Sequence, residues 1–160
     1  MCGINRNSFI LFAYICIISI LSLSGCEGFE QGRQSSLEYA TMDFMKDWAI
    51  ALEKYHKINK EYPTTNSIEE LQKILVPTYS ERLRTKNPWK EKYWVKCSKD
   101  GYEIIGSKGK GNIKGSELEE SEKRNKHLIM IQNGKFIQYS EQRSKLADKF
   151  NSEIQKYKKN

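Results

Sequence analysis

The stretch 92–107, KYWVKCSKDGYEIIGS, decides the fold because it predicts two adjacent β-strands. Apolar and polar residues alternate on both sides of a short polar turn, as in strands with one buried face. The turn is expected in SKDG (98–101), whose pair Asp100-Gly101 tolerates positive φ. The buried face of the first strand is expected to consist of Tyr93, Val95 and Cys97. Its cysteine would therefore be a buried thiol rather than a reactive one.

A second hairpin is predicted in residues 127–140, HLIMIQNGKFIQYS, with Asn133-Gly134 at its tip. Beyond it, residues 141–158 have the pattern of an amphipathic helix, with Ser140 as the expected N-cap. The apolar stripe of this helix consists of Leu146, Phe150, Ile154 and Tyr157. The stripe has two interpretations, closing the core of the domain or docking a partner protein, and we favour the first.

Two helices are predicted upstream of the hairpins. The first runs from about Leu37 to Lys57 and ends before Pro63, since a residue that precedes proline is pushed out of the helical region. Its apolar residues recur at three- and four-residue steps, and they are Leu37, Phe44, Trp48, Ala51, Leu52 and Tyr55.

The second helix, IEELQKILV, is short and is expected to end at Pro77. Ser67 and Glu70 fit a capping box, in which the hydroxyl and the carboxylate each accept from a free backbone amide. Its apolar face would contain Ile68, Leu71, Ile74 and Leu75.

Runs of helices followed by runs of strands indicate an α+β domain, with the long helix on one face of a small antiparallel sheet. The chain is expected to have four parts. They are a leader (1–25), a polar tether (26–36), an α+β domain (37–139) and a C-terminal amphipathic helix (140–160).

The leader contains an apolar block from Phe9 to Leu23, with Arg6 ahead of it. Those residues would make roughly 22 Å of helix, less than the ~30 Å hydrocarbon core of a bilayer. A charged start, a short apolar block and small residues at its end are typical of a secretory signal peptide.

The end of the leader, Leu23-Ser24-Gly25-Cys26, resembles the lipobox of bacterial lipoproteins. This resemblance implies that Cys26 receives lipid, that the chain is cut before it, and that fatty acyl chains such as palmitate hold the protein on a membrane. The alternatives are an ordinary secreted protein and an uncleaved anchor helix.

Cleavage at that point would leave 135 of the 160 residues, enough for one domain with a modest core. One of the 27 basic residues, Arg6, lies in the leader and all 20 acidic residues follow it, so the net charge would be +6. Outside the cytoplasm such a charge favours anionic lipid or wall polymer, and we expect no nucleic-acid partner. Cys97 would be the one free thiol.

Three stretches resemble the globular domain of the major pseudopilin of type II secretion: ALEKYHKINKEYPTTNSIEELQKIL, KNPWKEKYW and DGYEIIGSKGKG. The resemblance covers about residues 40–112 and implies a long helix packed on a small antiparallel sheet. Pro88 and Trp89 are expected to set a rigid loop and to close one end of the core. The matching positions are Ala51, Leu52, Tyr55, Tyr62, Pro63, Thr64, Thr65, Pro88, Trp89, Tyr93, Tyr102 and Ser107.

Two departures from that family bear on function. Its members keep a hydrophobic stem after their Gly-Phe cleavage point, whereas the polar residues EQGRQSS follow Gly28-Phe29 here. We therefore expect a domain that does not polymerise, with lipid in place of the stem.

The second departure is in the glycine-rich loop SKGKGN, where the family binds calcium through oxygen ligands including aspartates. Lys108 and Lys110 stand there instead, and an ammonium group cannot ligate a hard cation. We expect no calcium site in this loop, and the nearby Glu117, Glu119, Glu120 and Glu122 are expected to form a solvated run.

No catalytic motif is present, and His56 and His127 lie on different predicted elements without metal-ligand spacing. We expect no enzyme, no metal or cofactor and no small-molecule substrate.

The first hypothesis is a lipid-anchored, pseudopilin-like binding or assembly module of the cell envelope, linked to secretion machinery. The alternative is a structural lipoprotein that binds wall polymer or anionic lipid through its basic surface. The expected location is extracytoplasmic, on the outer membrane of a cell with two membranes or on the outer face of a single plasma membrane.

Overall fold

A computed structural model describes the backbone of residues 6–108 and 128–159, with side chains from Glu30 on. The chain divides into two compact units, Met1–Ser36 and Leu37–Asn160. The first helix, α1 (Arg6–Asn59), includes the described part of the first unit and continues into the second.

Helix α1 begins much earlier than the predicted start near Leu37, so the expected tether (26–36) is helical. Glutamate, glutamine and arginine in this segment are good helix formers, and they offset the cost of its glycines. Arg33 and Glu30 also pair one turn apart at 3.5 Å. Whether the segment acts as a tether stays a prediction.

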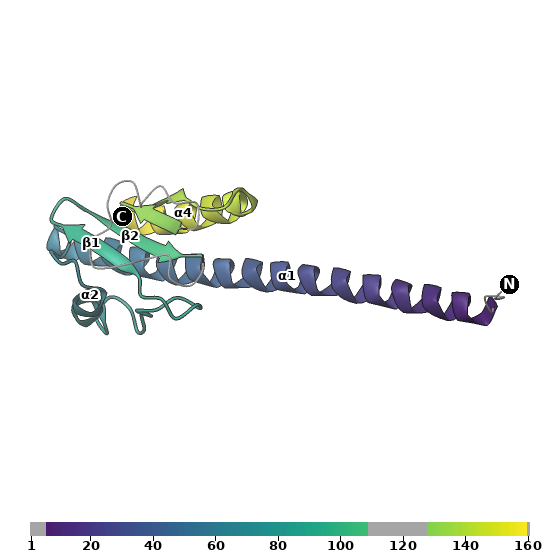
Figure 1. The fold of residues 1–160 in the computed structure, drawn as a ribbon. Coiled ribbons are helices and arrows are strands. Elements are labelled where there is room, and N and C mark those ends of the chain that lie inside the picture. Colours follow the sequence, from purple (N-terminus) through teal and green to yellow (C-terminus); the bar gives the residue numbers. More distant parts are fainter. Residues whose placement is uncertain (1–5, 109–127, 160) are drawn as a thin grey trace. The chain divides into compact units, whose positions relative to one another are not determined.

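The described residues of the second unit form a four-stranded antiparallel sheet in the order β1-β2-β3-β4. In Figure 1, β1 and β2 lie along the C-terminal part of α1. The α+β prediction is confirmed. The strands are β1 (Trp94–Ser98), β2 (Gly101–Ser107), β3 (Leu128–Gln132) and β4 (Lys135–Gln138).

The two hairpins differ in how well the sequence predicted their turns. Asn133 and Gly134 have φ values of 46° and 80°, as a two-residue turn of two left-handed positions requires. In the first hairpin Ser98 pairs with Gly101, which places Lys99 and Asp100 in the turn. The predicted turn SKDG (98–101) is therefore confirmed, although neither Asp100 nor Gly101 has a positive φ.

One face of the sheet packs on α1 to form the main core. The buried face of β1 is confirmed, since the three predicted side chains are at most 3% exposed. A Cβ at Gly106 of β2 would lie 2.8 Å from Met45 Sδ and 3.0 Å from the Thr41 methyl group, so only glycine lets α1 approach this closely. The α1 residues in this core are Met42, Met45, Trp48, Ala49, Ala51 and Leu52.

The predicted capping box of α2 (Ile68–Leu75) is half right. Ser67 is the N-cap, and its hydroxyl accepts from the Glu70 amide at 3.3 Å. The Glu70 carboxylate does not return to the Ser67 amide. Instead the Thr65 hydroxyl accepts from that amide at 3.0 Å and donates to Glu70 at 2.7 Å, so threonine completes the cap.

Asn87, rather than Pro88 and Trp89, organises the loop before β1. It is 4% exposed, and its side chain accepts from the amides of Trp89 and Glu91 and donates to the Ser107 carbonyl. Trp89 is only half-buried. The expectation that this indole closes the core is therefore wrong, because Asn87 fills the inward position.

The C-terminal helix is α4 (Ser144–Lys159), preceded by the short 3₁₀ helix η1 (Glu141–Arg143). Ser140 is the N-cap residue of η1, as its predicted position before residue 141 implies, but its side chain makes no cap hydrogen bond. Ala147, Phe150 and Ile154 of α4 belong to the main core. This packing supports the core interpretation of the helix.

Candidate functional site

Cys26, the predicted lipid-attachment residue, lies within α1, and its side chain is outside the described part. Among the described residues, no helix combines the length and the apolarity that crossing a membrane demands. Lipidation at this position stays a prediction from the sequence.

The most buried ionisable group among the described side chains is Glu53 of α1, which is 1% exposed. The hydroxyls of Tyr62 and Tyr102 donate to its two oxygens, each at 3.0 Å. Tyr62 comes from the segment after α1 and Tyr102 from β2, so this cluster ties three parts of the domain together. A buried carboxylate requires such partners because burial without them is costly.

The electrostatics of this cluster hold its phenols in the neutral, donating form. Burial is the main cause that raises the pKa values of Tyr62 and Tyr102, and the charge of Glu53 raises them further. The imidazole of His56 stacks on Tyr62 with ring centroids 4.4 Å apart. His56 thus packs on the edge of the cluster.

Cys97 lies close to this cluster on β1 and is 3% exposed. Burial raises the pKa of its thiol to about 12, so the thiol is protonated at neutral pH. A nucleophilic cysteine requires the opposite shift. The prediction of a buried thiol is confirmed.

No local pattern singles out Glu53, which stands as one polar residue within the predicted helix from about Leu37 to Lys57. A signal was available, since two tyrosines expected in the core need an acceptor for their hydroxyls. Glu53 also packs against the tip of the second hairpin. A Cβ on Gly134 would lie 3.0 Å from the Glu53 Oε1 atom. The arrangement has the chemistry of a structural polar core.

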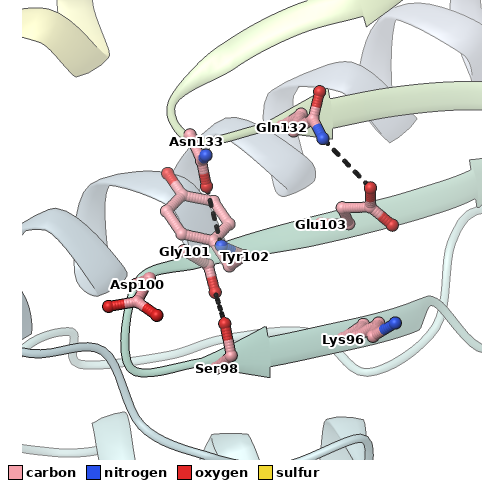
Figure 2. Close-up of a pocket in the computed structure, with 8 residues that line it drawn as sticks. All are labelled: Lys96, Ser98, Asp100, Gly101, Tyr102, Glu103, Gln132 and Asn133. Carbon is pink, nitrogen blue, oxygen red and sulfur yellow. Dashed lines mark hydrogen bonds between the residues drawn. The ribbon is translucent and has the colours of Figure 1, made fainter.

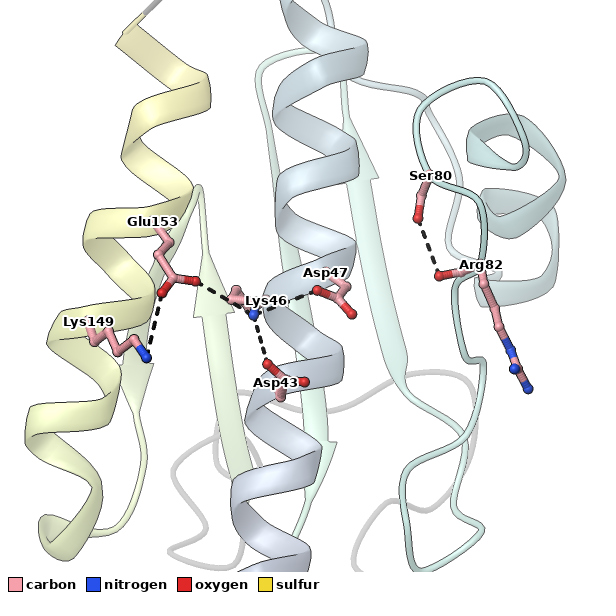
Figure 3. Close-up of polar contacts among 7 residues, drawn as sticks. All are labelled: Asp43, Lys46, Asp47, Ser80, Arg82, Lys149 and Glu153. Atoms are coloured by element: carbon pink, nitrogen blue, oxygen red, sulfur yellow. Dashed lines mark hydrogen bonds and ion pairs between the residues drawn. The ribbon is translucent and has the colours of Figure 1, made fainter.

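A second polar cluster joins α1 to α4 around Lys46 (Figure 3). Its ammonium group lies 2.7 Å from Asp43, 3.8 Å from Asp47 and 3.6 Å from Glu153. It also lies 4.7 Å from the ring centroid of Phe150. Burial opposes its charge, but the hydrogen bond and charge of Asp43 and the other carboxylates outweigh burial, and the pKa is raised.

The outer face of the sheet carries a shallow polar groove of about 340 Å³, shown in Figure 2. Gln132 of β3 donates to Glu103 of β2 at 3.1 Å, and Lys96 of β1 stands opposite Glu103. The Asn133 side chain accepts from the Tyr102 amide at 2.8 Å. Two pairs of groups thus bind each other at this end of the face, whereas Trp94, Ile105, Leu128 and Met130 form a buried apolar cluster elsewhere on the sheet.

Several predicted site residues lie outside the described part of the chain: His127, Lys110 and the glutamates at 117, 119, 120 and 122. The expected absence of calcium binding in residues 107–112 is therefore untested. Lys108 is described, and its ammonium lies 3.9 Å from Glu38. In residues 30–108 and 128–158, no three histidine, cysteine or acidic side chains gather as metal ligands would.

The described second unit is thus an α+β domain in which the C-terminal part of α1 packs on a four-stranded antiparallel sheet. Comparison with family models, with curated proteins and with solved structures found no match.

Proposed function

We propose that this chain is a lipid-anchored extracytoplasmic protein whose pseudopilin-like domain is a binding or assembly module of the cell envelope. Acylated Cys26 holds it on the membrane, and the domain does not polymerise. Its partner is a protein of the envelope, and the resemblance to the major pseudopilin links that partner to type II secretion.

The observation that carries this proposal is the position of Cys26. It follows Leu23-Ser24-Gly25 at the end of the apolar block that starts at Phe9. The thiolate is the nucleophile that lipid transfer requires, and small residues before it give a peptidase access to the backbone. More than one acyl chain on this cysteine would give stable anchoring.

The architecture supports the second half of the proposal. A long helix on a small antiparallel sheet is what the pseudopilin resemblance implies, and α1 packs in this way. The polar clusters around Glu53 and Lys46 hold α1, the sheet and α4 together. This packing supports a domain that binds partners through its surface.

The test compares Cys26→Ser with Cys97→Ala in the native host, using labelled palmitate and membrane fractionation. We expect label and membrane retention for the wild type and Cys97→Ala, and loss of the label for Cys26→Ser. Cross-linking of the acylated protein in its own membranes should then capture an envelope protein. Palmitate label that persists in Cys26→Ser would overturn the proposal.

The alternative, a structural lipoprotein that binds wall polymer or anionic lipid, is favoured by one surface. Lys86, Lys90 and Lys92 line a groove of about 540 Å³ before β1. Glu69 and Glu91 line the same groove and reduce its positive charge, and Glu69 pairs with Lys92 at 2.5 Å.

Retention on anionic vesicles or isolated wall should fall steeply with salt if this alternative holds, because salt screens exposed charges. The variant Lys86→Ala/Lys90→Ala should weaken it further, whereas Lys73→Ala on α2 serves as the control. Salt-independent capture of a protein partner favours the first proposal instead.

A further inference from the structure

A pocket of about 560 Å³ lies where the C-terminal ends of α1 and α4 meet the loop after α2. Tyr79 and Tyr157 form aromatic walls, and Ile58 stands beside them with 68% of its surface exposed. The pocket volume falls within the range of sites that hold ligand groups.

The walls of this pocket are fixed by contacts of their own. The Tyr79 ring packs on Tyr55 with centroids 5.1 Å apart, and its hydroxyl accepts from Asn59 at 3.0 Å. Lys54 donates to the Tyr79 carbonyl at 3.4 Å and lies 5.3 Å from the centre of the Tyr157 ring. Lys54 therefore bridges the two aromatic walls, so the pocket needs little ordering to accept a ligand.

The charged side chains that line the pocket are all positive. Lys54, Lys57 and Lys156 line the pocket and no acidic side chain does. Within the described part of the chain, no carboxylate lies within ion-pair distance of Lys54 or Lys57. Lysines near helix C-termini also interact favourably with the helix dipole. That interaction alone does not explain why a pocket with aromatic walls lies between these lysines.

We propose that this pocket is the docking site for an acidic peptide segment of a partner protein, which places one aliphatic or aromatic side chain between Tyr79 and Tyr157. Lys54 and Lys57 pair with the carboxylates that flank this anchor residue. The positive charge of the lysines favours an acidic segment. The apolar surface of Tyr79, Tyr157 and Ile58 holds its anchor side chain in one position. A membrane surface would instead require apolar side chains that protrude from a flat basic patch.

This inference deepens the proposed function, since it names the surface through which the envelope module binds. It does not depend on acylation. If Cys26 proves to be acylated and the pocket binds no peptide, only the present inference fails.

The test is fluorescence anisotropy of the full-length chain in detergent with a labelled dodecapeptide of glutamates around a central phenylalanine. A second peptide carries glutamine in place of each glutamate. We expect saturable binding of the acidic peptide, and about tenfold weaker binding of the glutamine peptide, because it retains the anchor but loses the ion pairs.

Two pairs of variants locate the site. Lys57→Glu and Ile58→Ser should each weaken binding about tenfold, and both positions are exposed, so the fold should persist by near-ultraviolet circular dichroism. Lys135→Glu and Ile137→Ser make the same changes on β4 and should leave binding within about twofold of the wild type.

Absence of saturable binding, or an equal loss in the β4 controls, would overturn the inference. A further arm uses dihexanoyl phosphatidylglycerol, a short-chain anionic lipid. If this lipid binds with the same dependence on Lys57 and Ile58 while the acidic peptide does not, the pocket recognises a headgroup and the peptide proposal is wrong.

Discussion

At the scale of single residues, Glu53 shows how a charge is accommodated in the core of this domain. Its two oxygens each accept a hydrogen bond from a tyrosine hydroxyl, and the three side chains come from separate parts of the chain. Removing one donor leaves an unpaired oxygen on a buried carboxylate, which costs more than the hydrogen bond itself contributes.

We predict that Tyr102→Phe lowers the free energy of unfolding by about 1.5–3 kcal/mol, the range for hydrogen bonds to charged groups. Urea denaturation followed by circular dichroism measures this change. Tyr157→Phe, at a side chain that is 40% exposed, is the control and should stay within about 0.5 kcal/mol of the wild type. Equal effects of the two substitutions would contradict the assigned role of Tyr102.

A second residue-scale prediction concerns alkaline pH. Burial raises the pKa of Cys97 from 9.0 to about 12, so the unfolded chain loses this proton at lower pH than the folded chain. The contribution of Cys97 to stability is complete below pH 9 and is lost as the pH rises toward 12. The loss is about 1.4 kcal/mol per pH unit.

The measurement is the free energy of unfolding between pH 8 and 10 for the wild type and Cys97→Ala. The wild type should lose stability above pH 9, whereas Cys97→Ala should stay nearly level until the tyrosines titrate. Parallel curves for the two proteins would show that folding does not raise the pKa of Cys97.

At the scale of elements, α4 is the helix whose role the sequence left open. Phe150 is 2% exposed and packs on Tyr39 and Phe136, with ring centroids 6.1 Å away in both cases. Lys46 of α1 lies over the Phe150 ring. It also pairs with Glu153, which follows Phe150 by about one turn of α4. The helix therefore completes the core of the domain, and its residues Lys156 and Tyr157 also line the pocket at the end of α1.

We predict that Phe150→Ala lowers the free energy of unfolding by about 3–5 kcal/mol, through lost burial and the cavity left behind. Lys145→Ala, at an exposed position on the same helix, should change it by less than about 0.5 kcal/mol. Chemical denaturation of both variants provides the values. A loss below about 1 kcal/mol for Phe150→Ala would mean that α4 is not part of the core.

The sequence predicted the elements whose signals are local. Alternation predicted the strands, Asn133-Gly134 predicted the second turn, and three- and four-residue steps predicted the apolar face of α1. The first turn, SKDG (98–101), was also predicted, but its Asp100-Gly101 pair does not adopt the positive φ that it tolerates.

Side-chain hydrogen bonds of loop residues, one local and one long-range, account for two of the other errors. The hydroxyl of Thr65 takes part in the α2 cap, and the side chain of Asn87 binds the Ser107 carbonyl across the fold. Nothing in the local pattern distinguishes these two polar residues from ordinary loop residues. The lysines and tyrosines of the proposed docking pocket were missed for the same reason, since they come from three separate elements.

At the scale of the whole molecule, the proposed protein consists of a lipid-bearing N-terminus followed by a binding domain. The basic charge of the chain, +7 over all residues, is compatible with an envelope location. The pseudopilin resemblance supplies the proposed link to secretion, and the pocket at the ends of α1 and α4 supplies the proposed contact. The proposed link to secretion requires the domain to be held outside the cell, whereas peptide binding by the pocket can be measured without acylation.

The most direct test is the intact mass of the protein extracted from its native membrane. The account predicts a chain that starts at Cys26 and carries additional mass from a diacylglyceryl group on that residue. A product that retains residues 1–25, or one that starts at Cys26 with an unmodified thiol, would contradict it.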